Sequence, residues 1–252
     1  MEFLELQDLT VNFNGFLAVD KVNLKIRKGE TRVVIGPNGA GKTTIIDMIT
    51  GKTKPTSGKI MIDGIDITGK NPEVIASKHK VGRKFQGPNV FDYMTVEENI
   101  EVALAGNSTV AKTFLYKKTK KIKEEIESIL KDINLFEKRA MLTTSLSHGE
   151  RQWLEIGMVI AQNPQIITLD EPTAGMTADE TYKTGELIKT LMKDQTVIVV
   201  EHDIDFVKQI AENVTVLHQG KLLAEGTYEE VTKNPEVIRV YLKNEEEADE
   251  AC

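Results

Sequence analysis

The sequence predicts an α/β fold with a mostly parallel core sheet, an N-terminal antiparallel β-subdomain and an inserted α-helical subdomain. Apolar runs at 166–169 and 196–200 are typical of buried strands, and a helical segment at 181–192 separates them. Strands that alternate with helices indicate a parallel sheet. Residues 119–130 carry apolar residues at helical spacing with charges between them, which indicates a mostly helical segment inserted between sheet strands.

The N-terminal part of the chain is predicted to consist of short strands joined by tight turns. An Asn-Gly pair at 14–15 and a Lys-Gly pair at 28–29 separate the extended segments, and the Asp-Gly pair at 63–64 is a hairpin signal. A helix is expected over 42–50, because Gly51 ends its pattern. The extended segments are predicted at 3–9, 22–26, 31–35, 59–62 and 65–67.

We expect a single domain over residues 1–243. Its catalytic core is predicted to comprise about 1–86 and 164–243, and its helical subdomain about 87–163. A chain of 252 residues is long enough to bury a core of this kind. Residues 244–252 are rich in like charges and are predicted to be disordered.

Composition and charge argue against several classes of protein. The net charge is −7, whereas a nucleic-acid-binding protein needs a basic face, so we expect no nucleic-acid partner. Cys252 is the single cysteine, which excludes a disulfide framework and favours a reducing compartment. No apolar run approaches the length of a bilayer span, and the acidic start lacks the pattern of a signal peptide. We therefore expect a soluble protein, which can still associate with a membrane protein.

A phosphate-binding loop is the most specific feature of the sequence. The segment GPNGAGKT at 36–43 lies between an apolar strand and a helix, which is the context that such a loop requires. Its glycines let backbone N–H groups point inward around an anion, Lys42 can reach the β- and γ-phosphates, and Thr43 can give its hydroxyl to Mg²⁺. The fold is thus predicted to be a P-loop NTPase. The residues expected to bind nucleotide here are Gly36, Pro37, Asn38, Gly39, Ala40, Gly41, Lys42, Thr43 and Thr44.

Two carboxylates, Asp170 and Glu171, follow the buried strand at 166–169. Ligands of open α/β sheets bind at the carboxyl ends of the strands. Asp170 is predicted to hold Mg²⁺, and Glu171 to accept a proton from a water that attacks the γ-phosphorus. Taken alone, the pair would equally suit a solvated turn at a strand end, and the phosphate loop decides between the two interpretations.

A second helix start resembles an anion site. Ser147 can cap the helix that follows, and Glu150 can complete a capping box. The free N–H groups of such a helix attract anions. Taken locally, the segment is only a helix start.

Three further residues, Gln86, His202 and Phe13, are candidates for the nucleotide site only because the phosphate loop is also present. Gln86, after a short strand-like run, is predicted to contact Mg²⁺ or the attacking water, although a loop glutamine is the plainer reading. His202 follows the strand at 196–200 and can contact a γ-phosphate, although a lone histidine is usually structural. Phe13 can stack on adenine, with Phe16 as a competitor and core packing as the alternative for both.

In this order, the motifs resemble the ATP-binding cassette superfamily. They are Phe13, GPNGAGKT at 36–43, Gln86, LSHGE at 146–150, IITLDEP at 166–172 and His202. The resemblance implies an ATP hydrolase with ATP and Mg²⁺ as cofactors, in which Glu171, His202, Gln86 and Lys42 serve catalysis and Thr43, Gln86 and Asp170 serve the metal. It also implies a head-to-tail dimer with an identical or different second cassette. In that dimer, Ser147 and Gly149 bind the γ-phosphate of the partner's ATP.

The sequence departs from the usual cassette pattern in two places. The segment LSHGE at 146–150 corresponds to the signature motif of the family. In it, His148 and Glu150 replace the commoner glycine and glutamine, whereas Ser147 and the second glycine, Gly149, remain. The loop at 173–177 lacks the usual aspartate, because Asp179 is displaced, and this puts one expected interface contact in doubt.

Within the superfamily, the chain resembles cassettes of the branched-chain amino-acid uptake type. The sequences at 15–20, 82–86 and 174–176 carry this resemblance. The segments 148–158 and 214–220 resemble the ATP-binding subunit of urea importers. The resemblance implies a subunit bound to transmembrane permease subunits on the cytoplasmic face of the membrane, driving an importer that is expected to carry urea. The alternatives are branched-chain amino-acid import, lipopolysaccharide export and a soluble cassette without a transport role. A non-enzymatic clamp is disfavoured because Glu171 is present.

Overall fold

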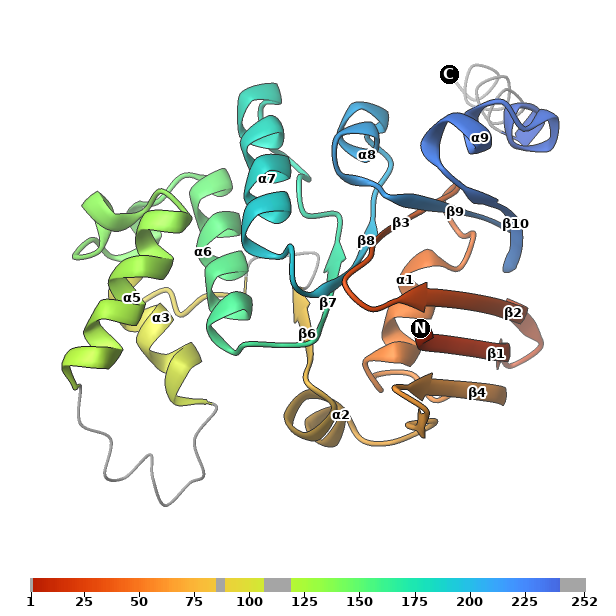
Figure 1. The fold of residues 1–252 in the computed structure, drawn as a ribbon, viewed down its shortest axis with the longest axis horizontal. Helices are drawn as coiled ribbons and strands as arrows, with labels where there is room; N and C mark the ends of the chain where they lie inside the picture. The colour runs from red at the N-terminus through yellow and green to blue at the C-terminus, as the bar shows by residue number, and fades with distance from the viewer. Residues whose placement is uncertain (1, 85–88, 107–118, 241–252) are drawn as a thin grey trace.

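A computed structural model of the protein describes residues 2–84, 89–106 and 119–240. In this part of the chain the strands form two sheets, with helices packed around them (Figure 1). Gln86 and the acidic segment 244–252 lie outside the described residues. Among those that are described, no helix is both long and apolar enough to cross a bilayer.

The core sheet is mostly parallel, as predicted. Its strands are β3 (Thr31–Ile35), β6 (Val81–Lys84), β7 (Ile166–Asp170), β8 (Thr196–Val200), β9 (Asn213–His218) and β10 (Lys221–Gly226). They lie in the order β10-β9-β3-β8-β7-β6. The pairs from β9 to β6 are parallel, and β10 pairs antiparallel with β9. The carboxyl ends of β3, β6, β7 and β8 therefore meet at one edge, where the candidate site lies.

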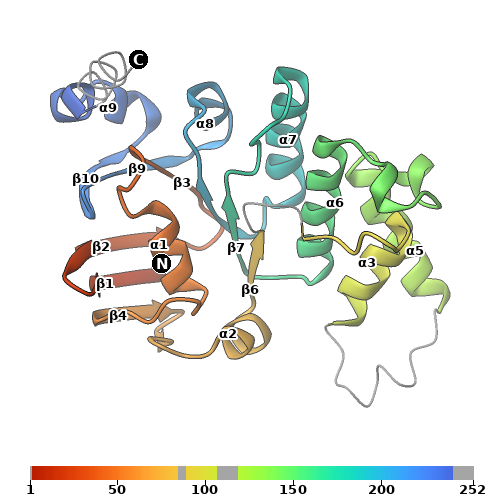
Figure 2. The same cartoon turned by 180° about the vertical axis from the view of Figure 1, so that it is seen from behind.

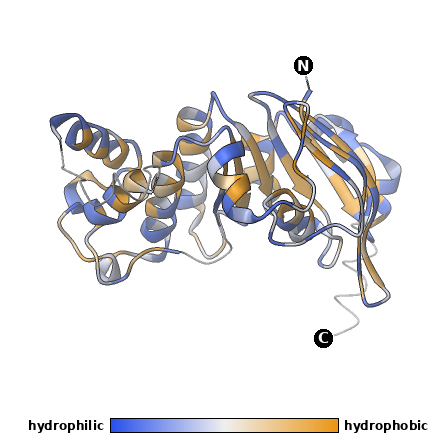
Figure 3. Ribbon diagram, turned by 90° about the horizontal axis from the view of Figure 1, so that it is seen from below, coloured by the Kyte–Doolittle hydropathy of each residue, from blue (hydrophilic) through white to orange (hydrophobic). Residues whose placement is uncertain are grey.

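The central strands are buried on both faces. Val33 and Ile35 of β3 pack into one apolar cluster, whereas Val34 between them packs into the other. In β8, Val199 likewise packs into the first of these clusters and Val200 into the second. This explains why these strands are continuous apolar runs rather than alternating ones. Figure 3 shows apolar residues along the strands and many hydrophilic residues on the helix surfaces.

The second sheet is antiparallel and N-terminal, also as predicted. It consists of β1 (Glu2–Phe13), β2 (Phe16–Arg27), β4 (Ser57–Ile62) and β5 (Ile65–Asp66), in the order β2-β1-β4-β5. The strands expected at 3–9 and 22–26 were too short. Irregular register between β1 and β2, with positive φ at Asp8 and Lys21, interrupts the alternation that marks a strand in sequence.

Helices cover the core sheet and form a separate group at one end of the molecule. Against the sheets lie α1 (Lys42–Ile49), α2 (Pro72–His79), α7 (Ala178–Leu191), α8 (Ile204–Ile210) and α9 (Tyr228–Thr232). The group comprises α3 (Val96–Ala105), α5 (Lys120–Asp132), the 3₁₀ turns η1 (Phe136–Lys138) and η2 (Thr143–Ser145), and α6 (His148–Ala161). Views from the front and from behind place α3, α5 and α6 together, at the end away from β1, β2 and β4 (Figures 1 and 2).

The helix predicted at 181–192 begins earlier than expected, at Ala178. Thr177 caps it, because its side chain accepts a hydrogen bond from the backbone N–H of Glu180 and the Glu180 carboxylate bonds back to Thr177. This capping box adds one turn to the helix.

Candidate functional site

The loop between β3 and α1 has the backbone of an anion nest. Gly36, Gly39 and Gly41 have φ values of 151°, 77° and 97°. A Cβ at Gly36 would lie 2.2 Å from the carbonyl oxygen of Leu217, and one at Gly41 would lie 2.6 Å from that of Ala18. Only glycine fits these positions, because both the conformation and the neighbouring backbone exclude a side chain. The loop is thus held against β9 and β2 with α1 beginning at its end.

Lys42 lies folded over this loop. Its ammonium Nζ donates to the carbonyl oxygens of Gly36 at 2.7 Å and Pro37 at 3.1 Å. Burial lowers the pKa of Lys42, and the carboxylates of Glu171 and Asp170 oppose that effect. A buried cation whose partners are carbonyl oxygens gains from an anion placed in the nest.

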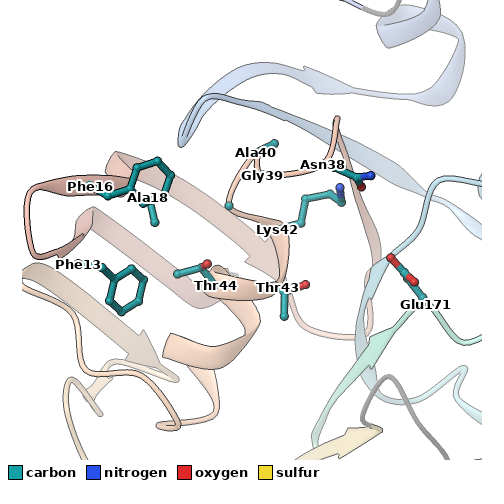
Figure 4. A pocket seen from close by; sticks show the side chains of 11 residues that line it. Phe13, Phe16, Ala18, Asn38, Gly39, Ala40, Lys42, Thr43, Thr44 and Glu171 are labelled. Carbon is teal, nitrogen blue, oxygen red and sulfur yellow. The ribbon is translucent and has the colours of Figure 1, made fainter. Parts of the chain in front are cut away.

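A cavity of about 250 Å³ extends along the loop (Figure 4). Phe13 and Phe16 lie at one end and Glu171 lies at the other, with the loop and the start of α1 between them. Both phenylalanines are exposed, at 47% and 64%. This order matches an elongated ligand with an aromatic group at one end and phosphates at the other, and both aromatic candidates remain in contact with the cavity. The full lining is Phe13, Phe16, Ala18, Asn38, Gly39, Ala40, Gly41, Lys42, Thr43, Thr44 and Glu171.

Thr43 and Asp170 meet across the sheet edge. The Thr43 hydroxyl lies 3.4 Å from Oδ1 of Asp170, although 127 positions separate them in the chain. Burial raises the pKa of Asp170, and the nearby Arg83 guanidinium opposes that effect. A hydroxyl and a carboxylate are oxygen donors, which suit Mg²⁺. No group of three or more His, Cys, Asp or Glu that could hold a metal occurs in the described part of the chain.

Glu171 and His202 face each other from neighbouring strand ends. Oε1 of Glu171 lies 3.8 Å from Nδ1 of His202, whose side chain is 68% exposed. The backbone of Glu171 has a φ of 45°, and its N–H donates to the carbonyl of Val200 at 2.9 Å. Glu171 thus leaves the line of β7 at a sharp turn, with its side chain directed to the cavity (Figure 4).

The signature helix α6 begins with the predicted capping box. The backbone N–H of Glu150 donates to Oγ of Ser147 at 3.2 Å, and the N–H of Ser147 donates to the Glu150 carboxylate at 3.1 Å. Gly149 is tightly surrounded, because an added Cβ would lie 2.4 Å from the Glu180 carboxylate. Neither Ser147 nor Gly149 is among the described residues that line the cavity. The chain therefore does not bring its own signature to its own phosphate loop.

Two buried charged residues at this edge were missed by the sequence analysis. Glu201 is 1% exposed and accepts hydrogen bonds from the hydroxyl of Thr173 at 2.5 Å and from the N–H of His202 at 2.9 Å. Arg83 reaches Asp170 from β6. The available signal was a charged residue inside or directly after a buried strand, which is rare without a partner.

Comparison with known proteins gives a consistent result along the chain. Residues 19–174 match the family described as "ABC transporter", and residues 221–242 match one described as "Branched-chain amino acid ATP-binding cassette transporter". The high-affinity branched-chain amino acid transport ATP-binding protein BraF of Pseudomonas aeruginosa is 38% identical, over 95% of this chain and 97% of its own. The corresponding protein LivG of Escherichia coli is 36% identical, with the same coverage.

Solved structures agree with the fold. The ADP conformation of MJ1267, an ATP-binding cassette of an ABC transporter, has a TM-score of 0.81 at 30% identity, covering 96% of this chain and 99% of that one. A dimeric, post-hydrolysis structure of the cassette MJ0796 bound to ADP and Pi has a TM-score of 0.77 at 27% identity, covering 89% and 98%.

Proposed function

We propose that this chain, which belongs to the ABC transporter family of ATP-hydrolysing cassettes, drives an importer of branched-chain amino acids. One observation carries the ATPase role: the cavity that joins two phenylalanines, the phosphate loop and Glu171 in that order. The cargo is supported by likeness to BraF and LivG along nearly the whole chain. Urea, the cargo favoured by the sequence analysis, rests only on segments 148–158 and 214–220, so it becomes the competing outcome of the test below.

For ATP hydrolysis we assign each part of the cavity one task. The loop amides and Lys42 bind the phosphates, and Phe13 or Phe16 stacks on the base. Glu171 accepts a proton from the attacking water, and His202, 3.8 Å away, contacts the γ-phosphate from the next strand end. Mg²⁺ held by Thr43 and Asp170 would neutralise phosphate charge. Gln86 is assigned to the same edge because β6 ends there, two residues before it.

The site is proposed to be completed by a second cassette. Ser147 and Gly149 lie outside the chain's own cavity, yet they begin a helix with free N–H groups suited to an anion. A head-to-tail pair would place them on the partner's γ-phosphate. The related cassette MJ0796 has been solved as a dimer bound to ADP and Pi.

The membrane partner is proposed from the relatives, which are named as transport ATP-binding proteins. We infer that permease subunits hold the dimer at the cytoplasmic face of the membrane. The negative net charge of the chain gives no support to a nucleic-acid partner.

Uptake in the source cells tests activity and cargo together. Replacing the chromosomal copy with Glu171→Gln removes the proposed base, and uptake of labelled leucine is expected to fall by roughly 10²–10⁴-fold, the usual worth of a general base. Labelled urea uptake is expected to stay unchanged. Glu127→Gln is the matched control, because Glu127 is an exposed carboxylate paired with Lys131 on α5.

Two outcomes separate the parts of the proposal. If urea uptake falls and leucine uptake persists, the cargo is wrong and the ATPase role stands. If purified Glu171→Gln protein hydrolyses ATP as fast as wild type, the assignment of Glu171 fails.

A further inference from the structure

Arg83 links the last strand before Gln86 to the helix that follows the phosphate loop. It lies on β6, and its side chain is 7% exposed. The guanidinium Nη1 lies 2.6 Å from Oδ1 of Asp47 and donates to the hydroxyl of Thr50 at 2.9 Å. Asp47 belongs to α1 and Thr50 ends it, so the guanidinium is anchored to the same helix that carries Thr43 at its start.

The same guanidinium also faces Asp170. Nη2 of Arg83 lies 3.7 Å from Oδ2 of Asp170, while the other oxygen of that carboxylate, Oδ1, lies 3.4 Å from the hydroxyl of Thr43. A carboxylate is planar, so a contact at one oxygen also sets the direction of the other. The contacts form a closed ring from Thr43 through Asp170 and Arg83 to Asp47, and back along α1.

We propose that Arg83 is a positioning residue that turns Asp170 so that Oδ1 faces Thr43, where Mg²⁺ is held during ATP binding. The inference rests on the proposed function and adds to it a residue to which the sequence analysis assigned no role. Arginine suits the task because its planar fork serves Asp47, Thr50 and Asp170 in fixed directions, whereas lysine carries the same charge without the fork. The site is buried, so salt screens these charges little.

Calorimetry with and without metal tests the proposal. ATP affinity is measured for wild type, Arg83→Gln and Arg83→Lys, first in EDTA and then in Mg²⁺. Loss of a group that orients a metal ligand typically lowers metal affinity about 10–100-fold, and we expect the gain in ATP affinity on adding Mg²⁺ to shrink by that factor in Arg83→Gln. Affinity in EDTA is expected to stay within roughly twofold, since the phosphate loop and Lys42 are untouched. The gain in ATP affinity on adding Mg²⁺ is expected to be intermediate in Arg83→Lys, between that of wild type and that of Arg83→Gln.

A second readout does not depend on turnover. Mn²⁺ replaces Mg²⁺, and its electron paramagnetic resonance is recorded in the ATP-bound protein. Wild type is expected to immobilise Mn²⁺ at concentrations at which Arg83→Gln leaves it free. Arg139→Gln is the matched control: Arg139 donates to the carbonyl of Phe136 on the helical group, so its loss removes an arginine contact away from the cavity.

Several results would overturn the inference. The inference fails if Arg83→Gln keeps the full gain in ATP affinity on adding Mg²⁺, or if this variant binds metal more tightly than wild type. It also fails if ATP affinity falls equally in EDTA and in Mg²⁺, because that result would show a purely structural role for Arg83. If Arg83→Gln does not fold, Asp47→Asn loosens the anchor instead and must lower the Mg²⁺ gain. Wild-type protein that binds no ATP would refute the proposed function rather than the role of Arg83.

Discussion

The side chain of His148 joins the start of the signature helix to the loop that follows Glu171. Its Nε2 lies 3.0 Å from the carbonyl oxygen of Ala174 and 3.2 Å from the side-chain nitrogen of Gln152, and the tautomer of the ring sets which of these contacts is a hydrogen bond. Signature residues are proposed to serve the partner's ATP, whereas Glu171 serves the chain's own. Under this proposal, the unusual histidine would lie between two nucleotide sites, beside the loop 173–177 whose usual aspartate is missing.

Replacing His148 by Ala is expected to loosen this loop. The free energy of unfolding should fall by about 0.5–1.5 kcal/mol, the usual net worth of one hydrogen bond. The rate of ATP hydrolysis should fall while ATP affinity holds, because the phosphate loop is untouched. Chemical denaturation and steady-state kinetics check the two effects. An unchanged rate would show that the contact does not hold Glu171 in its working position.

Replacing Glu201 by Gln tests the other support of the same loop. The buried carboxylate accepts from Thr173 and from the N–H of His202, and an amide would turn an NH₂ group toward one of these donors. A loss of about 1–3 kcal/mol in the free energy of unfolding is expected, the cost of leaving a buried polar group unsatisfied. Thermal or chemical denaturation measures it. Equal stability of variant and wild type would mean that water replaces the lost contact.

ATP affinity is expected to depend on alkaline pH through Lys42. Burial lowers the pKa of Lys42 in the free protein, and bound phosphates raise it, because anions favour the protonated ammonium. Binding therefore takes up protons, and the contribution of Lys42 to ATP affinity is full below the free-state pKa and is lost as pH rises from that pKa to the higher pKa of the bound state.

Lys42→Met should bind ATP weakly and lack this loss at alkaline pH. Calorimetry over the alkaline range compares the two proteins. A wild-type affinity that stays flat over that range would contradict the placement of the ammonium against the phosphates.

The sequence predicted the structural features that depend on residues close together in the chain. The glycine spacing of the phosphate loop, the Ser147–Glu150 capping box and the fully buried strands β7 and β8 depend on neighbours within a few positions. The fold class followed from the alternation of strands and helices. The strand lengths at the N-terminus did not, because bulges break the alternation there.

Local sequence patterns could not predict the contacts between segments that are far apart in the chain. His148 and Ala174 are 26 positions apart, and Arg83 meets α1 and β7 only after the sheet has formed. Glu201 was passed over for its neighbour His202, although the buried carboxylate accepts hydrogen bonds from both the N–H and the hydroxyl of Thr173 in the loop. The roles assigned to the site residues all stay predictions, and Gln86 lies outside the described residues.

The central claim is that each ATP lies between the phosphate loop of one chain and the signature of another. Ser147→Ala and Lys42→Ala are prepared separately, each nearly inactive, and mixed under conditions in which heterodimer formation is verified. If the site is shared, one interface of the mixed dimer carries both lesions and the other carries none. If the site is formed within one chain, every site keeps one lesion.

Mixing is therefore predicted to restore ATP hydrolysis, to at most half the wild-type level. A covalently linked dimer of wild type with the Ser147→Ala/Lys42→Ala double mutant is the control that one intact site turns over. With this linked dimer active, restored hydrolysis in the mixture supports the shared site, and a mixture that stays inactive contradicts it.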